Sequence, residues 1–106
     1  MKKMSEMTKE ELQMEMQRLW ALAKKKERAG FISEANVLEQ KFYLAKSYTM
    51  DPAQIEVGAR YRVAGEEGLF TVEYLNGIFA WGTLETDHEK RGFPIGRLEK
   101  AEGPPS

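Results

Sequence analysis

Apolar positions recur every three or four residues in the first half of the chain, as they do in a helix that buries one face. From residue 9 to about residue 29, the positions that share this face are Leu12, Met16, Leu19, Trp20 and Ala23. Thr8 precedes this stretch as a candidate N-cap, and Glu11 follows three residues later, where a capping box has its acidic member. Gly30 is the kind of residue that ends a helix. The pattern therefore predicts a helix from Lys9 to about Ala29.

A second stretch of helical spacing follows, with an apolar stripe broad enough to contact two neighbours. Its members are Val37, Leu38, Phe42, Leu44, Ala45 and Tyr48. We expect Ser33 to cap this helix, and we expect the helix to end before Asp51 and Pro52. Because the connection between the helices is short, residues 8–50 should form an antiparallel helical hairpin. A hairpin of this size buries too little to be stable alone, so its remaining apolar surface should pack on a sheet.

After Gly58 the apolar residues alternate with polar ones, which is typical of strands. Tyr61 and Val63 alternate with Arg60 and Arg62 in the first predicted strand. The two arginines should therefore project from the same face of that strand.

An Asn-Gly pair at residues 76 and 77 separates two alternating apolar runs and predicts a tight hairpin. With this pair as the loop, the expected partners are Leu75 with Ile78, Tyr74 with Phe79, and Val72 with Trp81. This register places five side chains on a common face: Phe70, Val72, Tyr74, Phe79 and Trp81. We expect that face to be a core, with Trp81 buried and with Leu75 and Ile78 on the other face docking under the helical hairpin.

A polar loop from residue 85 to 91 and two short strands near residues 93–95 and 97–98 complete the strand part. Seven of the nine glycines lie between Gly58 and Gly96, where the corners and bulges of a small barrel would need them. The fold predicted is α+β, a helical hairpin over residues 8–50 followed by a small SH3-like β-barrel over residues 57–99. We expect residues 1–106 to form a single domain, with residues 101–106 as a disordered tail.

The composition is that of an ordinary globular protein, with 106 residues, 42% of them hydrophobic and 31% charged. The absence of cysteine excludes disulfides, thiolate metal sites and cysteine nucleophiles, and it suits a reducing cytoplasm. No apolar run approaches the roughly 20 residues of a membrane span, and no secretory leader is visible. We therefore expect a cytoplasmic protein without membrane contact.

Charge is unevenly distributed between the two halves. Residues 1–50 hold ten Lys and Arg against seven Glu, whereas residues 51–106 hold six against ten Asp and Glu, so the halves carry +3 and −4. Lys24, Lys25 and Arg28 share one sector of the first helix, and with Arg60 and Arg62 they are the candidate contacts for an anionic partner. Complementation of the helix dipole by solvated side chains explains the helical cluster as well.

Candidate catalytic groups are few and have simpler explanations. His88 is the only histidine and lies in a polar loop, where consecutive side chains rarely converge on a metal ion. The acidic pairs at residues 10–11 and 66–67 fall at a helix start and a turn, where carboxylates are solvated. The loop from Gly65 to Gly68 is acidic and precedes a strand, unlike a phosphate-binding loop. We expect no enzyme activity, no cofactor and no catalytic or metal-binding residues.

Several segments resemble a known bacterial family: Met7-Thr8, Val37-Leu38-Glu39, Ala45-Lys46, Tyr61-Arg62-Val63, the block from Tyr74 to Gly82, and Pro94-Ile95. The chain is similar in these segments to the YfhH-like family, from about Met7 to Leu98. The resemblance implies a helical hairpin followed by an SH3-like barrel. The family has no established function and no recognised site residues, although some members are labelled transcriptional regulators.

Two binding hypotheses remain from the sequence. The first is a non-enzymatic regulatory protein, associated with transcription, that contacts nucleic acid through its basic residues. The alternative is a protein-protein adaptor without nucleic-acid contact, whose partner patch would be a groove near Trp81 or a surface formed by Leu75 and Ile78. The sequence leaves the oligomeric state open.

Overall fold

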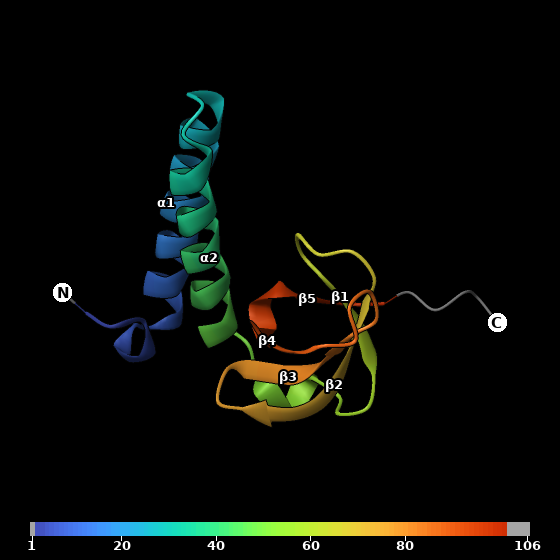
Figure 1. Cartoon of the computed structure of the whole chain (residues 1–106). Helices are drawn as coiled ribbons and strands as arrows, with labels where there is room; N and C mark the ends of the chain where they lie inside the picture. The colour runs from blue at the N-terminus through green and yellow to red at the C-terminus, as the bar shows by residue number, and fades with distance from the viewer. Residues whose placement is uncertain (1, 102–106) are drawn as a thin grey trace. The chain divides into compact units, whose positions relative to one another are not determined.

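The computed structural model describes residues 2–101, and the chain divides into two compact units after Met50. The first unit contains the two long helices and the second contains the strands (Figure 1). The predicted α+β class is therefore confirmed. Within the tail that was predicted to be disordered, residues 102–106 lie outside the described residues. The grouping of both units into one domain stays a prediction.

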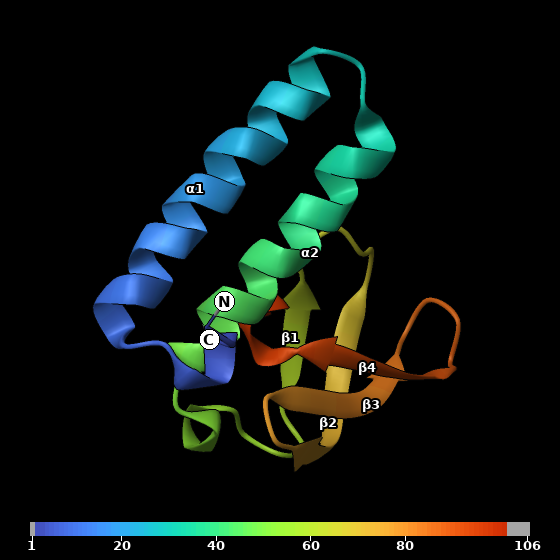
Figure 2. The ribbon, with the colours of Figure 1, turned by 90° about the vertical axis from the view of Figure 1, so that its left-hand side faces the viewer.

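The first unit is a helical hairpin. A short 3-10 turn, η1 (Met4–Glu6), precedes α1 (Lys9–Arg28) and α2 (Ile32–Tyr48). The two helices run antiparallel and lie side by side along their length, as both ribbon views show (Figures 1 and 2). Leu19 and Ala23 of α1 are almost fully buried, and the Trp20 and Phe42 rings meet across the two helices with centroids 4.9 Å apart.

The start of α1 follows the predicted capping box. Thr8 Oγ1 accepts a hydrogen bond from the Glu11 amide at 3.1 Å, and Glu11 Oε1 accepts one from the Thr8 amide at 2.9 Å. The prediction that Ser33 caps α2 is wrong. The helix begins at Ile32, Phe31 occupies the N-cap position, and its backbone oxygen accepts from the Ala35 amide without any side-chain cap.

The second unit is a single antiparallel sheet of five strands in the order β4-β3-β2-β1-β5. After the 3-10 turn η2 (Pro52–Gln54) come β1 (Arg60–Val63), β2 (Leu69–Asn76), β3 (Phe79–Leu84), β4 (Lys90–Pro94), the 3-10 turn η3 (Ile95–Arg97) and β5 (Leu98–Lys100). Strands β4 and β5 form the two edges, so the sheet is not closed by strand pairing. The SH3-like barrel expected from the sequence is thus not confirmed, whereas the predicted succession of short strands is observed.

The register of the β2–β3 hairpin differs from the prediction. Asn76 pairs with Phe79, so the loop consists of Gly77 and Ile78 instead of Asn76 and Gly77. Gly77 has a φ of 60°, and Asn76 is not among the described residues with positive φ. A glycine at the first central position is the mark of a type II′ turn, whereas the Asn-Gly loop expected from the sequence requires positive φ at both positions.

A bulge at Glu73 changes the register again within β2. Val72 pairs with Gly82, but Tyr74 pairs with Trp81, so Glu73 is an extra residue without an opposite partner. Because side chains alternate along a strand, one extra residue moves the rest of β2 to the other face. The expectation that Tyr74, Phe79 and Trp81 share a face with Phe70 and Val72 is therefore wrong.

The core of the second unit lies on one face of the sheet, which we call the inner face. Its buried side chains are Tyr61, Val63, Phe70, Val72, Ala80, Leu84, Phe93 and Leu98, with Ile55 and Ile95 from the turns. Phe70 and Phe93 meet edge to face, with centroids 5.1 Å apart and planes at 86°. The guanidinium carbons of Arg91 and Arg97 lie 5.5 Å and 5.0 Å from the centre of the Phe93 ring.

Among residues 2–101, no helix combines the length and the apolar character that crossing a membrane would require.

Candidate functional site

The basic cluster of α1 is only partly free. Lys24 Nζ lies 3.5 Å from a Glu27 oxygen, 3.8 Å from a Glu39 oxygen and 4.5 Å from the centre of the Trp20 ring. Lys25 and Arg28, in contrast, are exposed, and within the described part of the chain neither has an acidic partner. The predicted sector of three cations therefore contains two that are available to a partner.

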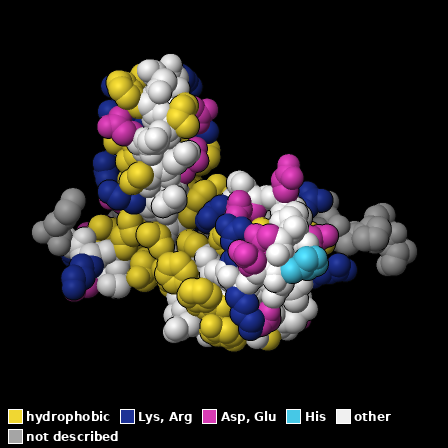
Figure 3. All heavy atoms as spheres, in the orientation of Figure 1, with side chains coloured by type: hydrophobic (Ala, Val, Ile, Leu, Met, Phe, Trp, Pro, Cys, Tyr) yellow, Lys and Arg dark blue, Asp and Glu magenta, His cyan; other side chains and the backbone are white. Residues whose placement is uncertain are grey.

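The lysine next to this sector is also engaged. Lys26 Nζ lies 3.6 Å from a Glu34 oxygen and 5.3 Å from the centre of the Phe31 ring. Acidic and basic side chains are both scattered over the visible side of the helical hairpin, among apolar ones (Figure 3). The hairpin thus carries no broad surface of a single charge on that side.

Arg60 and Arg62 project from one face of β1, as the alternation predicted. Both are exposed, while Tyr61 and Val63 between and beside them are buried on the inner face. We call the opposite side of the sheet the outer face. No ion pair engages either arginine within residues 2–101, although Glu99 lies opposite Arg62 in the register of β1 and β5.

Arg97 does not add to this basic surface. Its guanidinium donates to the backbone oxygen of Ala64 and lies over the Phe93 ring. The side chain therefore braces the β1–β2 turn against β4. Its donors are directed into the protein instead of toward a ligand.

The prediction that Trp81 is buried is wrong. Trp81 is 37% exposed and Tyr74 is 50% exposed, and both lie on the outer face because of the bulge at Glu73. Their rings are nearly parallel, with an angle of 11° and centroids 6.4 Å apart. The result is an exposed aromatic pair on two neighbouring strands.

Gly92 makes room for the Trp81 ring. It lies opposite Trp81 in the register of β3 and β4. A Cβ atom at position 92 would lie 2.8 Å from three carbons of the ring, and Cβ atoms in proteins essentially never approach another heavy atom so closely. The indole is thus held against the bare backbone of β4.

Glu73 directly precedes Tyr74 in β2, and its negative charge is balanced by Lys90. Glu73 accepts hydrogen bonds from Lys90 Nζ at 2.7 Å and from the Thr83 hydroxyl. These hydrogen bonds, that of Lys90 above all, hold the pKa of the Glu73 carboxyl below its ordinary value. Glu73 is therefore ionised at neutral pH and matched by the charge of Lys90.

The partner patch expected from Leu75, Ile78 and Trp81 is not a single surface. Leu75 pairs with Ala80 and is half-buried, Ile78 is half-buried in the turn, and Trp81 lies on the outer face. Leu75 pairs with Ala80, which is buried on the inner face and directly precedes Trp81 in β3. Because successive side chains of a strand alternate, Leu75 and Trp81 lie on opposite faces.

The acidic loops serve a structural purpose. Arg91 bridges them, with one nitrogen 2.9 Å from an Asp87 oxygen and another 2.8 Å from a Glu66 oxygen. His88 lies in the second loop with a φ of 57°, and residues 2–101 contain no group of three side chains placed to hold a metal ion. The single histidine is visible at the surface among charged side chains (Figure 3).

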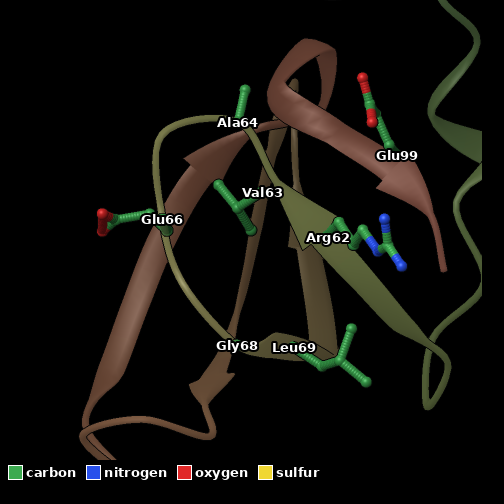
Figure 4. Close-up of a pocket in the computed structure, with 7 residues that line it drawn as sticks. All are labelled: Arg62, Val63, Ala64, Glu66, Gly68, Leu69 and Glu99. Carbon is green, nitrogen blue, oxygen red and sulfur yellow. The ribbon is translucent and has the colours of Figure 1, made fainter.

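Each of the two units has a shallow hollow on its surface. The first, of about 320 Å³, is formed by the β1–β2 turn and β5, with Arg62, Glu66 and Glu99 as its charged residues. Arg62 and Val63 point to opposite sides of β1 there, with Leu69 on the side of Arg62 (Figure 4). The second, of about 340 Å³, lies on the helical hairpin and is mostly apolar, with Met16, Trp20, Ala21 and Phe42 in its wall beside two glutamines.

The exposed aromatic pair was missed by reasoning from the sequence, and two glycines could have indicated it. Gly82 directly follows Trp81 in β3, and Gly92 lies inside β4. Glycine within a strand is a sign of a bulge or a close approach.

Comparison with known proteins confirms the resemblance seen in the sequence. A family model described as "Protein of unknown function (DUF1811)" matches residues 2–99. The chain is also 40% identical over 102 residues to "Uncharacterized protein YfhH" of Bacillus subtilis (strain 168), an alignment that covers 95% of this chain and 98% of that protein. This chain therefore belongs to the DUF1811 family of proteins of unknown function.

Proposed function

We propose that this chain is a non-enzymatic regulatory protein, associated with transcription, that binds nucleic acid through exposed cations. The observation that carries the proposal is that four of the five predicted basic residues form no ion pair among the described residues. Lys25, Arg28, Arg60 and Arg62 are exposed and have no acidic partner among the described residues. Cations without an internal partner can exchange solvent counterions for phosphates, which is the main source of affinity for nucleic acids.

The distribution of acidic groups is compatible with such contacts. Although the second half is acidic overall, Glu66 and Asp87 are paired with Arg91, and Glu73 is paired with Lys90. These pairs reduce the repulsion that phosphates would meet near the sheet. The non-enzymatic part rests on the placement of the carboxylates, which form exposed ion pairs and helix caps instead of a buried acid and base.

The architecture fits a binding module. We include in the proposal that the second unit is an SH3-like barrel, as the family resemblance implies. We also include that the protein is cytoplasmic, which its lack of cysteine favours. Pairing of β5 with β1 across the sheet, directly after the turn η3, supports the barrel because it brings the last strand back to the first. Small barrels of this kind carry ligands on a rigid sheet.

Fluorescence anisotropy tests the proposal. A labelled duplex DNA of random sequence and a labelled single-stranded RNA are titrated with the protein at about 50 mM and about 150 mM salt. We expect binding that weakens steeply with salt. The double variants Lys25→Gln/Arg28→Gln and Arg60→Gln/Arg62→Gln should weaken binding and flatten the salt dependence.

Lys26→Gln is the matched control for these variants, because Lys26 is already paired with Glu34. It should change binding much less than either double variant. Absence of binding to both nucleic acids at low salt would overturn the proposal.

A protein-protein adaptor is the second candidate, and the apolar hollow on the helical hairpin favours it. Trp20 is 39% exposed there, beside Phe42. Exposed aromatic side chains in apolar hollows are typical anchors of protein interfaces. Affinity capture from a bacterial lysate should then yield a partner with the original protein and not with Trp20→Glu, whereas equal recovery with both would argue against this surface.

A further inference from the structure

Building on the nucleic-acid proposal, we infer that the outer face of the sheet binds single-stranded nucleic acid, with bases stacked on Trp81 and Tyr74. Both rings are exposed on the same face, and their planes are nearly parallel. Every nucleobase has a flat π-face, so parallel exposed rings accept unpaired bases without regard to sequence. This step names the ligand of the surface and therefore depends on the proposed function.

The aromatic pair is held in place before any ligand arrives. The Trp81 ring packs against the backbone at Gly92, where a Cβ would lie 2.8 Å from the ring. Strand pairing after the bulge sets the backbone of Tyr74 opposite Trp81, and the two rings lie nearly parallel. A ring that is already positioned loses little conformational freedom when a base stacks on it, so more of the stacking energy contributes to affinity.

The charges on the outer face suit an anionic ligand. Arg60 and Arg62 stand on β1, on the same side of the sheet as the rings and two strands away from Trp81. At a strand spacing of about 4.8 Å, this places their backbone roughly 10 Å across the sheet from Trp81. The carboxylate close to the rings, Glu73, is already neutralised by Lys90. Phosphates of a strand whose bases stack on the rings can therefore reach free guanidinium groups.

The same geometry disfavours duplex DNA on this face. In a duplex the base faces are stacked on one another and cannot reach a ring on a sheet surface, whereas unpaired bases can be splayed onto aromatic side chains. The pair Tyr74 and Trp81 would thus contribute only to single strands. The arginines contribute to both forms.

The experiment uses a Trp20→Phe background, in which Trp81 is the only tryptophan. A 20-nucleotide oligothymidylate and a duplex of equal length, both labelled, are titrated with the protein while anisotropy and Trp81 emission are recorded. We expect single-strand binding with quenching of Trp81 and an affinity at least about tenfold above that for the duplex. Trp81→Leu and Tyr74→Leu should each weaken single-strand binding by about tenfold.

Two further variants keep the result interpretable. Trp81→Phe retains a ring and should keep most of the affinity, which separates loss of stacking from loss of folding. Phe31→Leu removes another exposed aromatic side chain, on the helical hairpin, and should have no effect. Circular dichroism confirms that each variant is folded.

The outcomes separate this inference from the proposed function. Duplex binding equal to or tighter than single-strand binding, or binding without quenching of Trp81, would overturn the inference and leave the nucleic-acid function standing. Absence of binding to either form at low salt would overturn both.

Discussion

At two glycines inside strands, Gly82 and Gly92, a Cβ atom would collide with neighbouring atoms of the protein. At Gly82 the place of the Cβ is taken by the backbone oxygen of Thr71, so the obstacle is a neighbouring strand. At Gly92 the obstacle is the Trp81 ring, which is a side chain and can rotate. Gly82 is therefore required for β2 and β3 to pair at this distance, and Gly92 is required for the Trp81 ring to lie where it does.

Replacing Gly82 by alanine should destabilise the protein severely. The added methyl would collide with backbone that is fixed by strand pairing, and relief requires separation of β2 from β3. We expect a loss of about 3 kcal/mol or more in the free energy of unfolding, measured by urea denaturation. Gly77→Ala is the control, since its Cβ meets open space and only the positive φ opposes it, at about 1 kcal/mol. Similar losses in the two variants would contradict the close approach at Gly82.

Trp81→Ala should cost little stability despite the size of the side chain. Because the ring is 37% exposed and packs mainly on Gly92 and Tyr74, we expect a loss of about 1 kcal/mol. Phe70→Ala, at a fully buried position of the inner face, should cost about 4 kcal/mol. Denaturant midpoints compare the two, and an equal loss would show that Trp81 belongs to the core.

At the scale of elements, capping residues in the sequence predicted the start of α1 correctly and the start of α2 incorrectly. The capping box of α1 could be read from the sequence because Thr8 and Glu11 satisfy each other within four residues. The start of α2 could not, because the turn at residues 29–31 fixes it: the Phe31 amide donates to the Lys26 oxygen, and the helix begins before Ser33.

Thr8→Ala should therefore destabilise the protein by about 1 kcal/mol, since the Glu11 amide at the start of α1 loses the hydroxyl that caps it. Ser33→Ala is the matched control, because Ser33 lies inside α2 and makes no cap. Thermal or urea unfolding followed by circular dichroism measures both. A loss with Ser33→Ala as large as that with Thr8→Ala would mean that the hydroxyl of Ser33 does cap the helix.

The strands show a different limit of sequence-based prediction. Alternation identified β1, β2 and β3, because one face of each is apolar, and the Asn-Gly pair located the turn between β2 and β3 to within one residue. Alternation could not locate the bulge at Glu73, since a bulge leaves no gap in the polar and apolar pattern and depends on the fit of β2 against Gly82. The aromatic pair of the candidate site was missed for this reason, whereas Arg60 and Arg62 precede the bulge and were placed correctly.

At the scale of the whole molecule, acid should lower stability. The pKa of Glu11 lies below its ordinary value of 4.5, chiefly because of the hydrogen bond from the Thr8 amide, and that of Glu73 is lowered chiefly by Lys90. A carboxyl with a lowered folded-state pKa stabilises the protein above its unfolded-state pKa, and this contribution disappears as the pH falls through the folded-state pKa.

Urea midpoints should thus be constant from about pH 7 to pH 5 and decline as the pH falls below about 4.5. Because these carboxylates are exposed, we expect a gradual decline. Glu73→Gln should make the decline shallower. A midpoint that rises on acidification would show that other groups dominate.

Each compact unit contains one tryptophan, Trp20 in the first and Trp81 in the second. The variants Trp20→Phe and Trp81→Phe therefore report separately on the two units. We expect coincident urea transitions, because a hairpin of two helices buries too little to be stable by itself. Two separate midpoints would show that the chain consists of two independent domains.

The bulge in β2 has a consequence for how such surfaces arise. Each residue of β2 after Glu73 lies on the face of the sheet opposite to the one that the alternation of apolar and polar residues predicts. Insertion or deletion of one residue in a strand can therefore expose or bury a pair of rings without a single substitution. A change of one residue in the length of β2 thus decides which of its later side chains are exposed, while the other residues of the strand stay the same.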